Sequence, residues 1–515
     1  MPVSPQFNSY CKHLLAFLLV GLLMCSLPLP QQITSAQPAT KTQDELRTKI
    51  VEYLDRDHYD NAFWAVKIID LSTNATVFEQ NVEKSLMPAS NTKLYTTAAA
   101  LDLLGPDFRY KTRLFADGPI EQGILKGNLI IRGSGDPTIG DRYVDGDPVM
   151  IFRNWARALK ELGIKQIAGD IVGDDDLFDD LTLGSGWSWD DEPYYYSAEI
   201  SALTFYDNSV RFILEGQRIN MPGKLRWEPS TSYVDVTNST ITVHPDSSDD
   251  VDYKRPRNFN TIEAIGEIYP ADIDTSYITV SNPTKYFTHV LREVLVEEDI
   301  VVKGRPVDVD ELSIKPQYKA TNIQELLVHN SPPLSEIIVI LNKESQNLYA
   351  ELVVRTVGAR HPVADEEEDT SSAEMGVFSS KETYARAAID TSSIKLVDGS
   401  GLSRYNLITA NMTASLLHYM WNHKNPDVRT AYYNSLPIGG VDGTLEDRFR
   451  RWPAYRNVRA KTGTFTAAST LSGYVSSAAG TPYLFVLMCN NFTIKTSVVR
   501  RTQDAIVNLL AKHEQ

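Results

Sequence analysis

The alternation of apolar and polar positions divides the chain of 515 residues into four parts. A short apolar run lies within residues 1–36. Helical and strand-like patterns alternate over residues 37–108, and short strand-like runs dominate residues 109–322. Helical periodicity returns in residues 323–515, together with three further strand-like runs. The pattern predicts an α+β protein in which a larger domain is interrupted by an insertion.

The first globular part is predicted to form a helix, a hairpin and a second helix. Residues 63–69 are almost continuously apolar, which favours a buried strand, and turn residues follow them. Further on, Leu94, Ala98 and Leu101 recur at the spacing of one helix face. We expect a helix at residues 44–54, strands at 63–69 and 75–79, and a buried helix over residues 87–101.

The middle part, residues 109–322, is predicted to contain mainly β domains, two and nested. Short strand-like runs are separated by clusters of turn residues, and one clear helix ends at Gly163. The expected strands are residues 112–116, 128–132, 167–172, 209–214, 240–244 and 277–281, and the expected helix is 150–162.

The last part, residues 323–515, is predicted to complete the first domain. Helical periodicity is expected at residues 323–327, 334–341, 343–352, 409–421 and 498–512. Strands are expected at residues 458–465, 470–475 and 483–489, as antiparallel neighbours.

The N-terminal run has the plan of a secretory signal peptide. Lys12 and His13 precede an apolar stretch at residues 14–29, and the small residues Thr-Ser-Ala follow at 34–36. We expect cleavage after Ala36 and export to the periplasm or cell envelope.

Two alternatives to a cleaved signal remain open. The run is short for a membrane span and is closed by Pro28, but an uncleaved anchor would leave the enzyme associated with the membrane surface. Cys25 suggests a lipoprotein, although Met24 is larger than the small residue that usually precedes a lipidated cysteine.

Charge and cysteine content narrow the function classes. The net charge is −16 and basic runs are absent from the sequence, which argues against a nucleic-acid partner. Of the three cysteines, only Cys489 remains after cleavage, inside an apolar run, so we expect it in the core and no intrachain disulfide. An exported chain without disulfides fits a bacterial envelope.

A serine and a lysine three residues apart provide the first candidate for catalysis. On a helix, Ser90 and Lys93 lie one turn apart on the same face. A serine hydroxyl becomes a good nucleophile when a neighbouring base takes its proton, and a lysine with a lowered pKa can be that base. Alone the pattern is weak, because Ser9 and Ser392 also begin a Ser-x-x-Lys.

Two further motifs downstream change this assessment. Ser345-Gln346-Asn347 is a Ser-x-Asn, and Lys461-Thr462-Gly463 is followed by Thr464. A Ser-x-x-Lys, a Ser-x-Asn and a Lys-Thr-Gly in this order are the three motifs of penicillin-binding proteins and serine β-lactamases.

With these motifs the chain resembles the low-molecular-mass class C penicillin-binding proteins, the D-alanyl-D-alanine carboxypeptidase/endopeptidases. The resemblance runs from about residue 60 to residue 490. It rests on Pro88-Ala-Ser-Asn-Thr-Lys93, Leu104-Gly-Pro-Asp-Phe-Arg109, Leu125-Lys-Gly-Asn-Leu129, Gly135-Asp-Pro-Thr138, Gly186-Trp-Ser-Trp-Asp-Asp191, Ser345-Gln-Asn347, Asp398-Gly-Ser-Gly-Leu-Ser-Arg-Tyr-Asn406, Leu436-Pro-Ile-Gly-Gly-Val-Asp-Gly-Thr-Leu445 and Ala460-Lys-Thr-Gly-Thr464.

The resemblance implies a β-lactamase/transpeptidase-like domain, with a five-stranded antiparallel sheet flanked by helices and split by inserted domains. The interval of 255 residues between Ser90 and Ser345 is much longer than in an ordinary class A β-lactamase. One departure from the family pattern is Gln346, where Asp is frequent; that position is not a direct catalytic group in the family.

The implied reaction is acyl transfer on the stem peptides of peptidoglycan, without a metal or cofactor, and β-lactam antibiotics are the implied inhibitors. Ser90 would attack the D-Ala–D-Ala carbonyl, with Lys93 as base and Lys461 lowering the pKa of Lys93. Ser345 would relay the proton to the leaving amine, and Asn347 would hold the substrate amide. The oxyanion hole would be made by the N–H groups of Ser90 and Thr464.

The substrate's ends are assigned to two further groups. Lys461, Thr462 and Thr464, beside Gly463, would hold the terminal carboxylate. In the family an acidic residue of the motif that ends at Asp191 meets the cationic side chain of the stem peptide, which would favour diaminopimelate-type stems. A surface aspartate beside aromatic packing is the alternative for Asp191.

Three other functions remain open. A serine β-lactamase would use the same acylation groups, but the inserted domains argue against it. A catalytically inactive peptidoglycan-binding protein would have no need of all five catalytic side chains. A Ser-His-Asp hydrolase lacks support, because the chain has no Gly-x-Ser-x-Gly. The balance between carboxypeptidase and endopeptidase activity and the oligomeric state are not predicted by the sequence.

Overall fold

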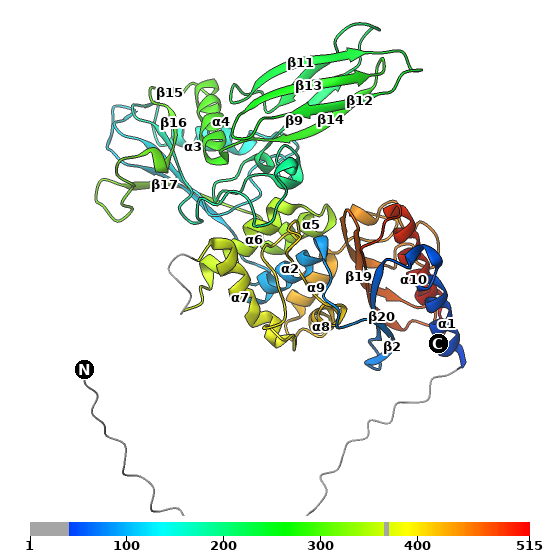
Figure 1. Cartoon of the computed structure of the whole chain (residues 1–515). Helices are drawn as coiled ribbons and strands as arrows, with labels where there is room; N and C mark the ends of the chain where they lie inside the picture. The colour runs from blue at the N-terminus through cyan, green and yellow to red at the C-terminus, as the bar shows by residue number, and fades with distance from the viewer. Residues whose placement is uncertain (1–40, 365–369, 515) are drawn as a thin grey trace, which may run out of the picture. The chain divides into compact units, whose positions relative to one another are not determined.

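The structure is a computed structural model that describes residues 41–364 and 370–514 (Figure 1). The predicted signal peptide and its cleavage site lie outside the described residues. Within the described ranges, no helix is long and apolar enough to cross a membrane.

A five-stranded antiparallel sheet joins the two ends of the chain. Its strand order is β18-β19-β20-β1-β2. The strands are β1 (Phe63–Asp70), β2 (Ala75–Gln80), β18 (Arg459–Phe465), β19 (Ala468–Ser476) and β20 (Pro482–Asn490). Strand β1 pairs with the late strand β20 from Phe63 opposite Asn490 to Asp70 opposite Tyr483. The predicted five-stranded antiparallel sheet is confirmed.

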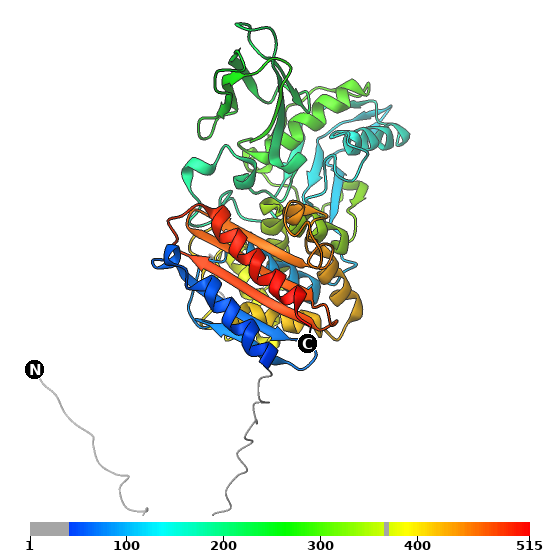
Figure 2. The ribbon, with the colours of Figure 1, turned by 90° about the vertical axis from the view of Figure 1, so that its right-hand side faces the viewer.

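Helices cover both faces of this sheet, which explains why its strand β20 is apolar at every position from Tyr483 to Cys489. Along β20, Phe485, Leu487 and Cys489 pack with α1 (Lys41–Leu54) and α10 (Thr496–Lys512) on one face. Figure 2 shows these two helices side by side across the sheet. The alternate residues of β20 point to the opposite face and its helices. Cys489, on the face covered by α1 and α10, is buried as expected.

The opposite face carries a helical layer centred on α2 (Thr92–Leu103), which is buried over almost its whole length. The remaining helices of this layer are α5 (Leu334–Lys343), α6 (Asn347–Arg360), α7 (Ser372–Arg386), α8 (Ala410–Trp421) and α9 (Pro426–Ser435). Helix α7 was not predicted from the apolar pattern. Its start does carry a signal, since Ser371 and Glu374 form a capping box.

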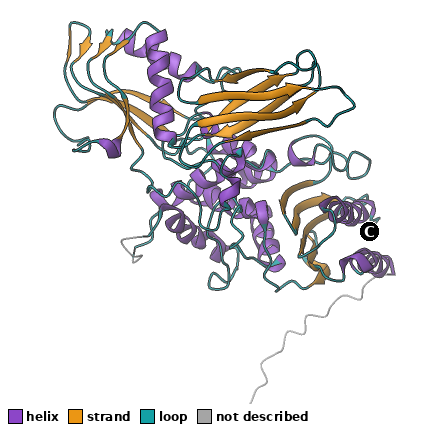
Figure 3. Cartoon of the chain, turned by 45° about the horizontal axis from the view of Figure 1, so that its top comes forward, coloured by secondary structure: helices purple, strands orange, loops and turns teal. Residues whose placement is uncertain are grey.

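The middle of the chain is built mainly of strands (Figure 3). A five-stranded sheet has the order β16-β8-β6-β3-β17, and a smaller sheet has the order β15-β7-β5-β4. Their strands are β3 (Lys111–Ala116), β4 (Ile120–Glu121), β5 (Ile124–Leu125), β6 (Leu129–Arg132), β7 (Gln166–Ile167), β8 (Ile171–Asp174), β15 (Val301–Val302), β16 (Pro306–Asp308) and β17 (Gln324–Asn330).

Two three-stranded sheets lie between β8 and β15 in sequence, with the orders β10-β9-β14 and β11-β13-β12. Their strands are β9 (Ser209–Glu215), β10 (Lys224–Glu228), β11 (Asp235–Thr242), β12 (Asp250–Lys254), β13 (Thr261–Ile268) and β14 (Ile273–Thr279). The helices of the middle part are α3 (Met150–Glu161), as predicted, and α4 (Pro283–Glu297), which was missed.

Two predicted elements of this region were wrong. The single strand expected at residues 167–172 is two strands in different sheets, because the chain crosses between the sheets at Gly169. A Cβ at Gly169 would lie 2.6 Å from the Gly127 carbonyl oxygen, so only glycine fits this crossing. The helical run expected at residues 323–327 is part of strand β17, which pairs with β3.

The division into catalytic and inserted segments stays a prediction. Because β17 pairs with β3 rather than joining the helical layer, we propose that the insertion ends after Asn330 and not at residue 322.

Candidate active site

Ser90 lies at the entrance of the buried helix, on a single 3-10 turn (Ala89–Asn91) that leads into α2. Ala89 has a φ of 47°, a left-handed conformation that side chains rarely adopt. Asn91 holds the turn against the sheet: it donates to the Lys461 carbonyl oxygen at 3.0 Å and accepts from Ser472 Oγ at 2.6 Å. Strands β18 and β19 therefore fix the position of Ser90.

Lys93 lies one turn further on, fully buried, and its amine makes three hydrogen bonds. Nζ lies 3.1 Å from Ser90 Oγ, 2.6 Å from Asn347 Oδ1 and 2.7 Å from the Ser400 carbonyl oxygen. Three acceptors in fixed directions hold the amine against the hydroxyl. The predicted pairing of Ser90 with Lys93 is present in the structure.

Burial lowers the pKa of Lys93 to about 7, and the negative charges of Asp398 and Glu351 oppose this shift. The prediction had Lys461 helping to lower the pKa of Lys93 by repulsion between like charges. The repulsion shows in Lys461 itself, whose pKa is lowered well below its usual value by burial and, second, by Lys93. An amine that is half neutral near pH 7 can accept a proton.

Ser345 lies in the short connection between α5 and α6, rather than in the single helix predicted over residues 343–352. Its φ of 61° is left-handed and turns the chain sharply between the two helices. Its Oγ accepts from the fully buried Lys461 Nζ at 2.9 Å. This hydrogen bond joins the Ser-x-Asn motif to the Lys-Thr-Gly motif. The bond between Lys93 and Asn347 joins the Ser-x-x-Lys motif to the Ser-x-Asn motif in the same way.

The turn at Ser345 is held by residues of the middle part of the chain. Gln346 Nε2 donates to Asp207 Oδ2 at 3.0 Å, and Arg142 Nη2 donates to the same oxygen at 2.7 Å. Arg142 also pairs with Glu344. Residues 206–208 all have positive φ, a strained run that aims Asp207 at the turn.

Asn347 has both ends of its amide occupied. Its Oδ1 accepts from Lys93, and its Nδ2 donates to the Tyr196 carbonyl oxygen at 2.6 Å. The predicted contact with a substrate amide is therefore in competition with Tyr196 in the free enzyme.

The loop 398–406 completes the surroundings of Lys93, and motif reasoning missed its role. Asp398 accepts from the backbone N–H groups of Gly401 and Ser403 and so shapes the loop that presents the Ser400 carbonyl. Glu351 Oε1 accepts from the Ser400 N–H at 2.8 Å. The sequence signal was the Asp-Gly-Ser-Gly turn.

A cavity of about 350 Å³ opens over the two serines. It is lined by Ser90, Ser345, Thr444, Arg448, Thr462, Gly463, Thr464 and Arg500. The three residues after Lys461 were predicted to bind substrate. All of them, Thr462, Gly463 and Thr464, line the same cavity as Ser90. Two arginines in this lining were not predicted.

Gly463 allows strand β18 to approach Ser90 closely. A Cβ at this position would lie 2.3 Å from Thr470 Oγ1, 2.6 Å from the Pro88 carbonyl oxygen and 2.9 Å from the Ser90 nitrogen. Any side chain here would push the strand away from the nucleophile.

Asp191 does not line this cavity. It ends a 3-10 turn (Trp189–Asp191) and accepts from the Tyr196 hydroxyl at 2.8 Å. Since the Tyr196 carbonyl oxygen accepts from Asn347, Tyr196 links Asp191 to the side chain that binds Lys93.

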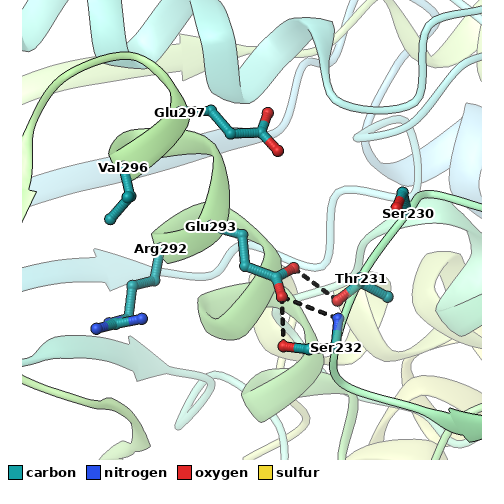
Figure 4. Close-up of a pocket in the computed structure, with 7 residues that line it drawn as sticks. All are labelled: Ser230, Thr231, Ser232, Arg292, Glu293, Val296 and Glu297. Atoms are coloured by element: carbon teal, nitrogen blue, oxygen red, sulfur yellow. Dashed lines mark hydrogen bonds between the residues drawn. The ribbon is translucent and has the colours of Figure 1, made fainter.

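A second pocket, of about 340 Å³, lies on the middle part (Figure 4). Its central carboxylate, Glu293, accepts from Thr231 Oγ1 at 2.7 Å and from the Ser232 hydroxyl and N–H at 2.6 and 2.9 Å. Burial raises the pKa of Glu293, but His289 and these donors lower it to about 2 overall. The carboxylate of Glu293 is therefore occupied in fastening the 231–232 segment to α4.

The comparison with protein families decides the identity. The profile of the D-Ala-D-Ala carboxypeptidase 3 (S13) family matches residues 46–513. The chain belongs to this family. The S13 match spans every motif of the cavity, from Ser90 to Thr464.

Individual relatives agree with the S13 assignment. The chain is 31% identical over 505 residues to the D-alanyl-D-alanine carboxypeptidase of Actinomadura sp. (strain R39), which covers 94% of this chain and 89% of that protein. It is 28% identical to D-alanyl-D-alanine carboxypeptidase DacB of Haemophilus influenzae, over 82% of this chain and 84% of the relative. The predicted serine-type D-Ala-D-Ala carboxypeptidase is confirmed at the level of the S13 family.

A solved structure confirms the fold. The crystal structure of penicillin binding protein 4 (dacB) from Haemophilus influenzae superposes with a TM-score of 0.75 at 23% identity, covering 92% of this chain and 100% of that one. The same protein is also known in complex with a β-lactam.

Proposed function

We propose that this S13 enzyme releases terminal D-alanine from peptidoglycan stem peptides through an acyl-enzyme on Ser90. The observation that carries the proposal is the distance of 3.1 Å between Ser90 Oγ and the buried Lys93 amine, whose pKa is about 7. A nucleophile within hydrogen-bond reach of a base that is neutral at working pH is the requirement for nucleophilic catalysis.

In the acylation step, neutral Lys93 takes the proton of Ser90 as Oγ bonds to the carbonyl carbon of the penultimate D-alanine. The tetrahedral intermediate then breaks its C–N bond and leaves the acyl group on Ser90. The departing amine takes a proton from the Ser345 hydroxyl, and the proton that Lys93 took from Ser90 restores this hydroxyl, so that Lys93 is neutral again. The Lys461 amine, 2.9 Å from Ser345 Oγ, holds the hydroxyl in place for this relay. Water hydrolyses the ester with Lys93 again as base.

Charge on the carbonyl oxygen would be stabilised by the N–H groups of Ser90 and Thr464. Close approach of β18 at Gly463 brings these two backbone segments together. Loss of one such donor lowers kcat by about 100- to 1,000-fold in comparable sites. Lys461, Thr462 and Thr464 are assigned to the terminal carboxylate.

Asn347 is assigned first to holding Lys93, because its Oδ1 accepts from that amine at 2.6 Å. A contact of its Nδ2 with the substrate requires the Tyr196 carbonyl to give way. Asp191 remains our candidate for the cationic group of a diaminopimelate-type stem, because Tyr196 links it to Asn347. An Asp191→Asn enzyme with unchanged preference for stems carrying that amino group contradicts this role.

The same acyl transfer extends to two other reactions. Penicillin would acylate Ser90 and leave slowly; the β-lactam complex of the Haemophilus protein supports this. Endopeptidase cleavage of cross-links next to D-alanine uses the same groups. A β-lactamase is the second candidate, distinguished by fast release of the drug. Export through the predicted signal and a cell-envelope location belong to the same proposal.

The deciding experiment is labelling of the mature protein with a fluorescent penicillin, followed by intact mass, with Ser90→Ala in parallel. A stable adduct on the wild type and none on the variant supports the acyl-enzyme. Drug turnover without a lasting adduct favours the β-lactamase. A folded wild-type protein with neither adduct nor turnover contradicts the proposal and favours an inactive binding protein. D-Alanine release from a stem peptide then measures the carboxypeptidase activity directly.

A further inference from the structure

The wall of the active-site cavity carries two arginines, Arg448 and Arg500, that motif reasoning did not assign. Arg448 follows the 3-10 turn Gly443–Leu445, and Arg500 lies in the first part of α10. Arg500 Nη2 donates to Thr464 Oγ1 at 3.1 Å. The guanidinium therefore lies next to a residue already assigned to the substrate's carboxylate.

The two arginines differ in their partners. Arg448 is satisfied within the protein: Nη2 and Nε donate to Asp504 Oδ1 at 2.6 and 3.0 Å, and Nη2 also reaches Gln503. Arg500 has no carboxylate within ion-pair distance among the residues that the structure describes. Two cations at one wall with a single carboxylate between them leave a net positive charge that faces the cavity.

The surroundings of Arg500 favour an anionic ligand. Partial burial and, second, the positive charge of Arg448 lower the pKa of Arg500, with Asp504 opposing them. Both influences disfavour the bare cation, and the attraction of an anion bound beside it would offset them. The planar guanidinium presents parallel N–H groups that match the two oxygens of a carboxylate.

The hydrogen bond to Thr464 also has a direction. Because Thr464 Oγ1 accepts from Arg500, its own O–H is free to donate elsewhere, and Thr464 lines the cavity. A carboxylate between them would accept from the hydroxyl and from the guanidinium together.

The proposed substrate carries one negative group on this side of the cut bond. In an acyl-D-Ala-D-Ala peptide, the terminal carboxylate is separated from the scissile nitrogen by a single carbon atom. A carbonyl carbon at Ser90 therefore keeps the carboxylate within the same cavity, close to β18.

We propose that Arg500 determines the requirement for a free carboxylate on the residue that the enzyme releases, by binding that carboxylate together with Thr464. This inference rests on the proposed acyl transfer at Ser90. The chemistry selects substrates whose leaving residue ends in an ionised α-carboxyl group, whether this residue is a terminal D-alanine or a cross-linked amino acid.

The test compares two peptides that differ only at this group: acyl-D-Ala-D-Ala with a free C-terminus and the same peptide with a C-terminal carboxamide. Arg500→Gln is expected to lower kcat/KM for the free acid by about 10- to 100-fold. It should leave kcat/KM for the carboxamide within about twofold, since that substrate has no charge to lose. Arg500→Lys keeps the positive charge but loses the planar pair of N–H donors. Its kcat/KM for the free acid should lie between those of the wild type and Arg500→Gln.

A second pair of probes tests the same assignment without measuring the turnover of the peptide carboxamide, which is expected to be slow. Benzylpenicillin and its methyl ester both carry the reactive lactam, and intact mass follows acylation of Ser90 by each. Arg500→Gln should slow acylation by the acid and leave acylation by the ester unchanged. Arg501→Gln, an exposed neighbour on the same helix, is the matched control and should change neither rate.

The outcomes separate the two proposals. If Ser90→Ala still cleaves the peptides, the proposed function fails. If Ser90→Ala is inactive but Arg500→Gln affects acid and neutral probes equally, or affects neither, the assignment of Arg500 is overturned. Thermal unfolding of each variant verifies that it is folded.

Discussion

Replacing Lys93 by methionine tests how strongly the fold opposes a charge at this amine. The pKa of Lys93 is lowered from 10.5 to about 7, mainly because the amine is completely buried. A lowering of this size means that protonated Lys93 is disfavoured by the folded protein by about 5 kcal/mol. Methionine has a similar length and carries no charge, so Lys93→Met removes this penalty.

The penalty has a defined pH window. The unfolded chain keeps the amine protonated up to an ordinary pKa of 10.5, whereas the folded protein releases that proton near pH 7. Between these values the unfolded state binds more protons, so the free energy of unfolding rises with pH. From about pH 7 to about pH 9.5, Lys93 contributes about 3 kcal/mol to this rise.

Urea unfolding followed by tryptophan fluorescence, at both pH values, measures the difference. Between about pH 7 and about pH 9.5, the free energy of unfolding of the wild type should rise by about 3 kcal/mol more than that of Lys93→Met. Lys84→Met, which removes an exposed lysine, is the control and should follow the wild type. Equal pH responses of wild type and Lys93→Met would refute the conclusion that burial lowers the pKa of this amine. Lys93→Met also removes the donor to Asn347 Oδ1 and the Ser400 carbonyl oxygen, but this loss affects both pH values alike and does not enter the comparison.

Three further outcomes are expected. Acylation by a fluorescent penicillin should fall about tenfold per pH unit below about pH 6 and level off above about pH 8, because only neutral Lys93 accepts the proton of Ser90; a rise centred above about pH 9 contradicts this. Gly463→Ala should slow acylation at least about 100-fold in a protein with an unchanged circular dichroism spectrum, since its Cβ would lie 2.9 Å from the Ser90 nitrogen; normal labelling would show that the close approach is unnecessary. Asp207→Ala should lower kcat for D-alanine release about tenfold with little change in KM, because it frees Gln346 and the turn at Ser345, and Asp207→Asn should recover part of the loss; a KM effect alone would place Asp207 in substrate binding instead.

The parts of the fold that could be predicted are those in which local pattern and tertiary environment agree. Residues 483–489 are apolar at every position because helices cover both faces of β20, and they were predicted correctly as a strand. Residues 323–327 (Ile-Gln-Glu-Leu-Leu) have apolar side chains at the spacing of one helix face, and they were misassigned because pairing with β3 overrides this local pattern. The crossing at Gly169 depends on a backbone contact with Gly127, which leaves no periodic signal.

The candidate site divides in the same way. Ser90, Lys93, Ser345, Asn347 and Lys461 could be found because short motifs carry them. The structure brings their side chains into two hydrogen-bonded groups, Ser90–Lys93–Asn347 and Ser345–Lys461. Glu351 and Arg500 were missed because each is a single charged residue on a helix, with a role set by what lies opposite. That burial is the largest cause of the lowered pKa of Lys93 could not be predicted, since the degree of burial of a lysine cannot be read from its neighbours in sequence.

The order of strands in the central sheet has a consequence for how activity arises. Strand β1 pairs with β20, and Ser90 is fixed by β18 and β19, so the nucleophile near the start of the chain is positioned by strands near its end. Contacts of such long sequence separation form late, because the loop between them must close first. A chain interrupted anywhere before residue 461 lacks the strand that orients its own serine. Enzymatic competence is thus withheld until the whole polypeptide has been made and assembled, and penicillin labelling reports on completed folding rather than on the presence of the protein.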